Sequence, residues 1–412
     1  MISTAGSIPA LRVHTQLLQD DGPLIEWMSP QFPVAFLRNG EGIVGFGEAH
    51  GMQAPTIPLL AELWHDAVAS AEVIDEVELP GSGLVALGSF AFSPASAQNS
   101  MLTIPAVIIG RRDGVTWITR VRDGYPIERS PLGADFTTEF VPGAQSEAGY
   151  VASVREAITR IAGGEAEKVV LARDLVGGIP SRAELHGLPD LRTVVARLAA
   201  SYPDTFTFAV DGLIGSSPET LVTVKGGTAS ARVLAGTSAR GADDAADALA
   251  ESTIAASPKD LAEHDFAVQS VLASLSGHGS DFAATSPYPL RLPNLWHLAS
   301  DVTGHLTDNS TALDLVAALH PTAAVAGSPT DVAVSMIAEL EPFDRGRYAG
   351  PVGWVDGNGD GEWAVALRCA RFEDETVTAF AGAGIVADSV PERELAETEL
   401  KFLPIVDALR RR

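Results

Sequence analysis

Residues 205–214 read Thr205-Phe206-Thr207-Phe208-Ala209-Val210-Asp211-Gly212-Leu213-Ile214. An Asp-Gly pair readily adopts the positive φ angles of a two-residue hairpin turn, and here it separates two runs of strand-forming residues. The same arrangement recurs at Asn39-Gly40 and at Asp113-Gly114, each between apolar runs of the same kind. The sequence therefore predicts antiparallel hairpins along the whole chain.

Helices are expected between these hairpins. Apolar stripes with helical spacing run over residues 151–161 and 191–198. Three more helix starts are indicated by Ser257-Pro258-Lys259-Asp260, by Thr311 with Asp314, and by a capping box at Ser389-Val390-Pro391-Glu392. Hairpins interleaved with helices favour an α+β fold in which helices pack outside antiparallel sheets. Because no linker rich in Pro, Gly and Ser interrupts the pattern, we expect one domain over residues 1–412.

The composition narrows the class of protein. The chain has 28 basic and 53 acidic residues and a net charge of −25, which disfavours binding to nucleic acid or to anionic lipid. The single cysteine, Cys369, excludes an intramolecular disulfide and a cysteine-based zinc cluster. Residues 1–11 lack the features of a signal peptide, and the apolar run 102–109 is far shorter than the ~20 residues that span a bilayer. We therefore expect a cytoplasmic protein.

Several polar residues stand where they could carry chemistry, although each also has an ordinary structural interpretation. Lys168 shares a strand face with Val170 and Ala172, so it lies either at a solvated strand end or in a cleft. Glu219 follows the hairpin at Asp211-Gly212 and could be an ordinary turn acid. Glu263 borders the apolar stripe of its helix, which also fits a solvated flank.

The C-terminal part contains a second group of candidates. Glu394, Glu397 and Lys401 share one helical face, either as a surface ion pair or as carboxylates for a hard cation beside a lysine for a substrate carboxylate. Arg368 lies opposite the apolar side of its strand, facing either solvent or a pocket. The stretch Gly382-Ala383-Gly384 is either a tight strand exit or a bare backbone that approaches an anion.

Taken together and in this order, the motifs resemble the chorismate-utilising enzymes, and within them the isochorismate synthases. The resemblance covers about residues 150–412, whereas residues 1–145 match only loosely, so we expect a variable N-terminal part and a motif-rich catalytic part over 146–412. The matching stretches are Lys168–Arg173, Gly215–Glu219, Leu234–Gly241, Ser257–His264, His297–Ser300, Leu319–Thr322, Glu341–Arg345, Tyr348–Trp354, Gly361–Ala370, Ala381–Val386 and Glu394–Lys401.

The resemblance implies an α/β sandwich of two antiparallel sheets with the active site between them. It implies a Mg²⁺-dependent reaction in which water adds at ring C2 of chorismate while the C4 hydroxyl departs. By analogy, Lys168 is the general base and Glu219 the general acid. Glu263 and Glu397 hold Mg²⁺, with Glu394 as a candidate water-mediated ligand. The substrate is bound by Ala235, Gly236, Thr237, His297, Arg368, Gly382, Gly384 and Lys401.

Three outcomes within the family remain open, of which isochorismate synthase is the first. Aminodeoxychorismate synthases carry a nucleophilic lysine where this chain has Ala235, and anthranilate synthases differ around His320-Pro321-Thr322, so neither is expected. Salicylate synthase, which eliminates pyruvate from isochorismate, is the closer rival, because Ala323–Gly327 and Ala299-Ser300 depart from the usual pattern. An inactive chorismate-binding homologue is the third. The sequence leaves open whether the product serves menaquinone or siderophore synthesis, and it leaves the oligomeric state open.

Overall fold

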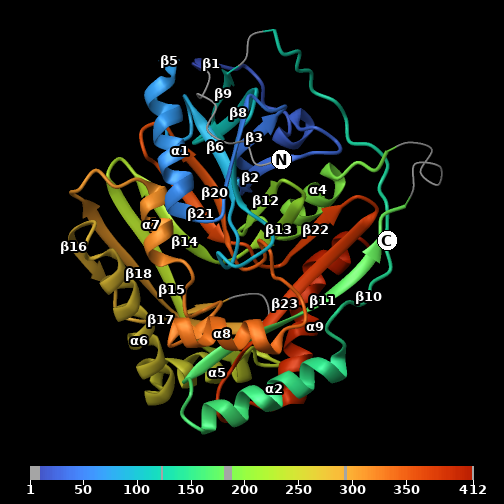
Figure 1. Ribbon diagram of the computed structural model, residues 1–412, viewed down its shortest axis with the longest axis vertical. Helices are drawn as coiled ribbons and strands as arrows, with labels where there is room; N and C mark the ends of the chain where they lie inside the picture. The colour runs from blue at the N-terminus through green and yellow to red at the C-terminus, as the bar shows by residue number, and fades with distance from the viewer. Residues whose placement is uncertain (1–9, 122–123, 181–187, 292–294, 411–412) are drawn as a thin grey trace.

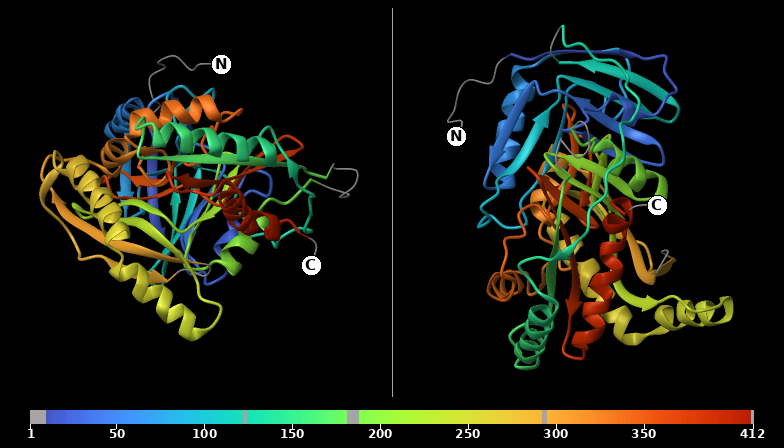
Figure 2. Two further views of the ribbon diagram at one scale, coloured as in Figure 1. Left: turned by 90° about the horizontal axis from the view of Figure 1, so that it is seen from below. Right: turned by 90° about the vertical axis from the view of Figure 1, so that its right-hand side faces the viewer.

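The computed structural model describes residues 10–121, 124–180, 188–291 and 295–410, apart from the side chains of Thr237, Lys259, Glu263 and Leu295. Within these residues the chain forms two large sheets with helices around them (Figure 1). In the right-hand view of Figure 2 the blue N-terminal strands form one end of the molecule, and α2 (Glu147–Ala162) and α5 (Asp244–Ala256) lie at the other.

The larger sheet, sheet A, has 13 strands among the described residues. Its order is β10 (Val141–Pro142), β11 (Lys168–Gly178), β23 (Thr376–Ile385), β22 (Cys369–Glu373), β13 (Leu213–Ser217), β12 (Phe206–Val210), β2 (Val34–Arg38), β3 (Glu41–Phe46), β8 (Val107–Arg112), β9 (Val115–Arg120), β1 (Arg12–Leu17) and β5 (Glu72–Asp75), with β19 (Gly327–Ser328) paired to β11. The pairs are antiparallel except β1 with β5, which are parallel, so the expected antiparallel sheet is present apart from this edge.

The smaller sheet, sheet B, has 10 strands in the same described part of the chain. Its order is β16 (Gly279–Ala284), β18 (Leu295–Leu306), β15 (Thr228–Ala239), β14 (Thr220–Lys225), β21 (Gly361–Val365), β20 (Pro351–Asp356), β6 (Val85–Ser89), β7 (Ser100–Ile104) and β4 (His50–Ala54), with β17 (Tyr288–Arg291) paired to β18. The N-terminal part of the chain therefore contributes strands to both sheets.

Helices pack on both sheets. The remaining helices are α1 (Ile57–Ser70), α4 (Arg192–Ser201), α6 (Pro258–Leu275), α7 (Ala312–Leu319), α8 (Thr330–Leu340) and α9 (Pro391–Ala408), and a short 3₁₀ helix, η1, spans Leu24–Trp27. Helices α4 and α9 pack on strands of sheet A, and α6 and α7 pack on strands of sheet B. Helix α8 packs against β11 and β19, close to the start of β11.

Among the described residues, two large apolar cores lie on opposite faces of sheet A, and a third, small cluster is formed by Ile254, Trp296 and Leu298. On β12, Phe206, Phe208 and Val210 belong to the core between the sheets, whereas Ala209 faces the core under α4 and α9. Side chains on a strand point to opposite faces in turn, so a strand buried on both sides reads as continuously apolar. All five residues of β12, including Thr207, are buried for this reason, because sheet A lies between sheet B and the helices.

The predicted hairpins are confirmed. At Asn39-Gly40, Asp113-Gly114 and Asp211-Gly212 both residues of each pair have positive φ, between 47° and 77°. The turns connect β2 to β3, β8 to β9 and β12 to β13. The expected α+β fold of two largely antiparallel sheets is therefore present.

The predicted helix starts are confirmed with one exception. Ser257 accepts a hydrogen bond from the Asp260 N–H at the start of α6, and Thr311 forms a capping box with Asp314 at α7. The capping box predicted at Ser389 is absent, because Val390 is the N-cap of α9 and no side chain caps it. The Ser389 hydroxyl instead accepts a hydrogen bond from the Val386 N–H.

Candidate active site

Lys168 is the first residue of β11, where β19 and β23 lie on either side. Gly384 of β23 pairs with Val170, so it lies on the same side of the sheet as Lys168. A Cβ atom at Gly384 would lie 3.0 Å from the Lys168 Cε and 3.7 Å from its Nζ. The bare backbone of Gly384 therefore makes room for the end of the Lys168 side chain.

Glu219 lies where the chain crosses from β13 of sheet A to β14 of sheet B. Its N–H donates to the Ser217 hydroxyl at 3.2 Å, and its carbonyl accepts from the Val365 N–H at 3.1 Å. No described residue forms a hydrogen bond to its carboxyl group. Burial raises the pKa of Glu219 by desolvation, against the opposing effect of the charges on Lys168, Lys401 and Arg368. The buried environment therefore favours the protonated form of Glu219 more than an exposed environment would.

Arg368 lies at a second crossing, beside the first. The chain leaves sheet B after Val365 and enters sheet A at Cys369, and Arg368 between them has a φ of 49°. The expectation that Arg368 lies within a continuous alternating strand is therefore wrong: the two halves of that stretch belong to different sheets. Burial lowers the pKa of Arg368 by desolvation, and the nearby Tyr348, Glu397 and Glu219 oppose this change. The guanidinium remains a cation held at the seam between the sheets.

A bulge in β15 shapes a second wall of the site. The pairing with β18 shifts between Ala235 and Thr237, and Gly236 between them has a φ of 79°, which favours glycine. His297 of β18 donates from Nδ1 to the Gly236 carbonyl at 3.1 Å. Desolvation lowers the pKa of His297 to about 4, so the ring is neutral at pH 7. At the bulge, backbone atoms and a neutral imidazole therefore line the site.

Helix α9 carries the charged groups of a third wall. The Lys401 ammonium lies 2.6 Å from the Glu397 carboxylate and donates to the Gly382 carbonyl at 2.8 Å. Burial raises the pKa of Glu394, one turn earlier, and the negative charge of Glu397 adds to this effect. Burial lowers the pKa of Lys401. Two carboxylates and one ammonium therefore share the helical face that the sequence predicted.

These walls enclose a cavity of about 350 Å³, called the central cavity below. The predicted site residues that line it are Lys168, Glu219, Ala235, Gly236, His297, Arg368, Gly382, Gly384, Glu394, Glu397 and Lys401. The side chains of Thr237 and Glu263 lie outside the described residues. Within the described part of the chain, no cluster of three or more His, Cys, Asp or Glu side chains has the geometry of a metal site.

The lining residues that the sequence did not single out as candidates include Tyr348 and Asp260. Tyr348 stacks on Phe380 with ring centroids 5.1 Å apart, and its hydroxyl would lie 3.2 Å from a Cβ at Gly382. Burial raises the pKa of Tyr348, so its phenol is a neutral hydrogen-bond donor. Asp260, at the start of α6, lies against Gly236. Tyr348 begins one of the quoted motifs, which was the available signal, whereas Asp260 looked only like a helix-start residue.

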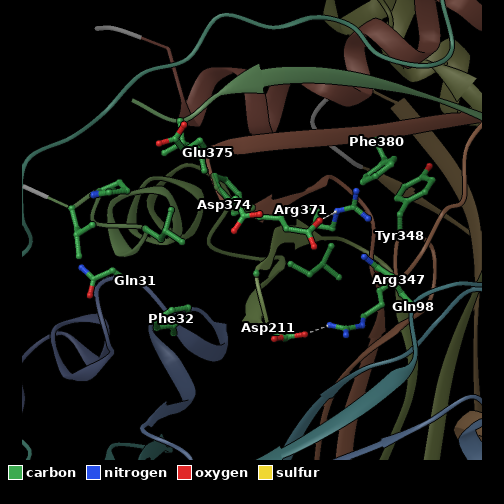
Figure 3. A pocket seen from close by; sticks show the side chains of 18 of the residues that line it. Gln31, Phe32, Gln98, Asp211, Arg347, Tyr348, Arg371, Asp374, Glu375 and Phe380 are labelled. Carbon is green, nitrogen blue, oxygen red and sulfur yellow. Dashed lines mark hydrogen bonds and ion pairs between the residues drawn. The ribbon is translucent and has the colours of Figure 1, made fainter. Parts of the chain in front are cut away.

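Figure 3 shows a different cavity, whose volume is about 660 Å³ and which Tyr348 and Phe380 also line. Two of its arginines pair with acidic residues of the same wall: Arg347 lies 2.6 Å from Asp211, and Arg371 lies 3.3 Å from Glu373. Neither Lys168 nor Glu219 lines this cavity. Although it is larger, it lacks the acid and base groups that the central cavity brings together.

Comparisons with known proteins agree with this geometry. Residues 135–410 match the family model described as chorismate binding enzyme. The chain is 39% identical over 312 residues to the isochorismate synthase DhbC of Bacillus subtilis, covering 72% of this chain and 75% of that protein. It is 39% identical over 244 residues to the isochorismate synthase EntC of Escherichia coli, covering 58% of this chain and 61% of that protein.

A solved structure extends the similarity to almost the whole chain. The menaquinone-specific isochorismate synthase MenF of Escherichia coli superposes with a TM-score of 0.81 at 25% identity, over 98% of this chain and 96% of that one. The superposition includes the N-terminal part, whose sequence matched only loosely.

Proposed function

The chain belongs to the family of chorismate-binding enzymes, and from this premise we propose that it is an isochorismate synthase. The observation that carries the proposal is the placement of Lys168 and Glu219 on one cavity of about 350 Å³ that also contains Arg368 and Lys401. The relatives named isochorismate synthase support the same reaction. No helix among the described residues is long and apolar enough to cross a membrane.

The charges of the central cavity suit chorismate, which carries two carboxylates. A chain with a net charge of −25 repels a dianion at long range, so the site needs local cations to bind it. Arg368 and Lys401 supply positive charge at the cavity, and the glycines Gly382 and Gly384 also line it. We expect these groups to bind the two carboxylates, and the bulge at Gly236 with His297 to contact the ring.

Lys168 and Glu219 can perform the two proton transfers of the isomerisation. The oxygen of water forms a bond to C2 while its proton passes to Lys168. The two ring double bonds shift, the C4–O bond breaks, and Glu219 protonates the departing hydroxyl to give water. One water is consumed and one is released, so the substrate and product have the same formula. The buried environment of Glu219 favours the protonated form that this step requires.

The acidic residues of α9 fit a hard divalent cation. Mg²⁺ prefers carboxylate oxygens and keeps several waters, so it needs few protein ligands. Glu397 with Glu263 would hold it, and Glu394 would contact it through water; the mutual repulsion of Glu394 and Glu397 fits such a role. When bound, Mg²⁺ supplies positive charge for the ring carboxylate of the substrate. Lys401, which neutralises Glu397 in this structure, would then be available to the substrate.

One assay tests the proposed function. The purified protein is incubated with chorismate and Mg²⁺, and the products are separated by chromatography. Isochorismate as the sole product supports the proposal. Salicylate with pyruvate would instead identify the rival activity, in which the departures near Ala324, a residue of the cavity wall, change the outcome of the reaction. Absence of turnover would identify an inactive chorismate-binding homologue.

A further inference from the structure

The edge of β11 that faces away from β23 is only partly covered by other strands. Among the described residues, β19 pairs with residues 168–169 on this edge, and β10 pairs with residues 175–176. Residues 170–174 lie between these pairings, are buried, and have no strand partner there within the described part of the chain. Their backbone groups that point to this edge therefore need other hydrogen-bond partners. The gap begins two residues after Lys168, the expected general base.

A buried ion pair occupies this gap. Glu341 directly follows α8, and its carboxylate lies 2.6 Å from the Arg345 guanidinium. The carboxylate accepts a hydrogen bond from the Ala172 N–H at 2.7 Å, and the guanidinium donates to the Val170 carbonyl at 2.7 Å. The side chains of Glu341 and Arg345 are only 1% and 3% exposed. The ion pair therefore takes the place of a neighbouring strand along this part of β11.

The same guanidinium holds a second segment of the cavity wall, the one between α7 and β19. Arg345 donates to the Val325 carbonyl at 2.9 Å, and the next residue, Ala326, accepts a hydrogen bond from the Val170 N–H at 2.8 Å. Val325, Val170 and Lys168 all line the central cavity. A guanidinium has five N–H donors in a fixed planar arrangement, so it can bond to the carboxylate and to both carbonyls at once. One side chain thus fixes two backbone segments relative to each other.

The contribution of this ion pair is geometric. Burying two charges costs desolvation energy that their attraction largely only offsets, so apolar residues of similar volume are often equally stabilising. Apolar residues, however, cannot accept a hydrogen bond from the Ala172 N–H or donate to the carbonyls of Val170 and Val325. The ion pair supplies these three hydrogen bonds, and all three go to the backbone of the segments that carry the cavity wall.

We propose that Glu341 and Arg345 are positioning residues for the reaction, which hold β11 so that Lys168 keeps its place beside the substrate. This inference rests on the proposed function, because it takes Lys168 as the base of the isomerisation. Glu341 and Arg345 transfer no proton and act through the backbone of β11. The end of the Lys168 side chain fits closely against Gly384 of β23, so a shift of β11 would displace the amine. A displacement of about 1 Å can lower the rate of catalysis about 10²-fold.

Arg345→Lys tests the positioning role with the charge retained. An ammonium group lacks the planar arrangement of donors, so it cannot bond to the carboxylate and to both carbonyls at once. We expect kcat to fall by about 10–100-fold. The KM for chorismate should change much less, because the expected carboxylate-binding groups, Arg368 and Lys401, are left in place. A wild-type kcat in the folded variant, or a rise in KM with kcat intact, would overturn the proposal.

Arg192 provides a matched control. Its guanidinium is also buried, lies 2.7 Å from the Asp190 carboxylate, and donates to the carbonyls of Ser130 and Pro131, but it lines neither the central cavity nor the cavity of Figure 3. Arg192→Lys should therefore lower the thermal unfolding temperature, as Arg345→Lys does, and keep the wild-type kcat at temperatures where the protein is folded. An equal fall of kcat in both variants would attribute the effect to lost stability and contradict positioning.

A double variant keeps the proposal testable if Arg345→Lys does not fold. Glu341→Met combined with Arg345→Met removes both charges and keeps a similar volume, so no unpaired charge is left buried. We expect this variant to fold and still to lose about 10–100-fold in kcat, because the three backbone groups have lost their partners. A wild-type kcat in the double variant would show that packing alone is sufficient, and the proposal would be wrong.

Amide hydrogen exchange tests the contact with β11 independently of turnover. The Ala172 N–H should exchange faster in the double variant than in the wild type, because its acceptor is gone. Peptides from β8, in the same sheet but remote from the ion pair, should exchange as in the wild type. Unchanged exchange at Ala172 would overturn the inference. If the wild type forms no isochorismate, the proposed function fails, and this measurement still decides whether the ion pair holds β11.

Discussion

Two parts of the central cavity hold their charged groups in different ways: the strand wall, which carries Lys168 and Glu219, and the helix wall, which is the face of α9 with Glu394, Glu397 and Lys401. On the strand wall, Glu219 is buried at a crossing between sheets, and no described residue forms a hydrogen bond to its carboxyl group. On the helix wall, Glu397 and Lys401 neutralise each other at 2.6 Å and remain partly exposed. Burial therefore controls the protonation of Glu219. On α9, by contrast, Glu397 and Lys401, which we expect to contact the metal and the substrate, cancel each other's charge. The first arrangement suits proton transfer, and the second allows charges to be redistributed when ligands bind.

The largest expected effect comes from removing the catalytic pair on the strand wall. Lys168→Ala and Glu219→Gln should each lower kcat by about 10²–10⁴, the usual contribution of a general acid or base. Chorismate binding should persist, because the helix wall and Arg368 are intact. Steady-state kinetics and a binding titration measure the two quantities. Lys225→Ala, at an exposed lysine, is the matched control, and a near-native kcat in Lys168→Ala would show that the base lies elsewhere.

On the helix wall, the expected effect is on the metal requirement. EDTA should abolish activity and Mg²⁺ should restore it. Glu397→Gln should raise the Mg²⁺ concentration for half-maximal rate by about 10–100-fold, because a neutral amide is a weaker ligand than a carboxylate for a hard cation. Rate measurements over a Mg²⁺ series give this value, with Glu392→Gln at the exposed start of α9 as control. An unchanged Mg²⁺ requirement would remove Glu397 from the metal site.

A smaller effect is expected from the space beside Lys168. Gly384→Ala places a methyl group 3.0 Å from the Lys168 Cε, and the flexible end of the lysine must shift. We expect kcat to fall by about tenfold, since small displacements of a catalytic group are costly. Gly178→Ala on the same sheet meets no atom within 4 Å and serves as the control. Equal kinetics in both variants would mean that Lys168 tolerates displacement.

The smallest expected effect is on how the stability of the folded protein depends on pH. The folded pKa of Glu219 lies above the ordinary value of 4.5, so the folded protein keeps a proton over a pH range in which the unfolded chain has released it. The stability of the wild type should fall as the pH rises through that range. Glu219→Gln cannot ionise and should lack this fall. Thermal unfolding from mildly acidic to mildly alkaline pH tests the difference, and parallel curves would contradict the assigned environment.

The sequence alone determined the local structure, because local interactions fix it. The three hairpin turns follow from residues that tolerate positive φ, and the start of α6 follows from a side chain that bonds to the backbone three residues on. The failure at Ser389 has the same origin, since a capping pattern competes with tertiary contacts that the pattern does not include, here the bond from Val386. The motifs also placed the candidate groups in order along the chain.

Only the tertiary structure decided which of these groups meet and what environment each one has. Glu219 and Arg368 lie at two neighbouring crossings between sheets, and neither crossing has a local sequence signal. The central cavity is lined by residues of β11, α6 and α9, which are remote from one another in the chain. Burial, desolvation and cavity shape depend on such long-range packing, whereas turn and cap preferences depend on a few adjacent residues. For that reason the sequence predicted the chemical groups, and the fold set their protonation.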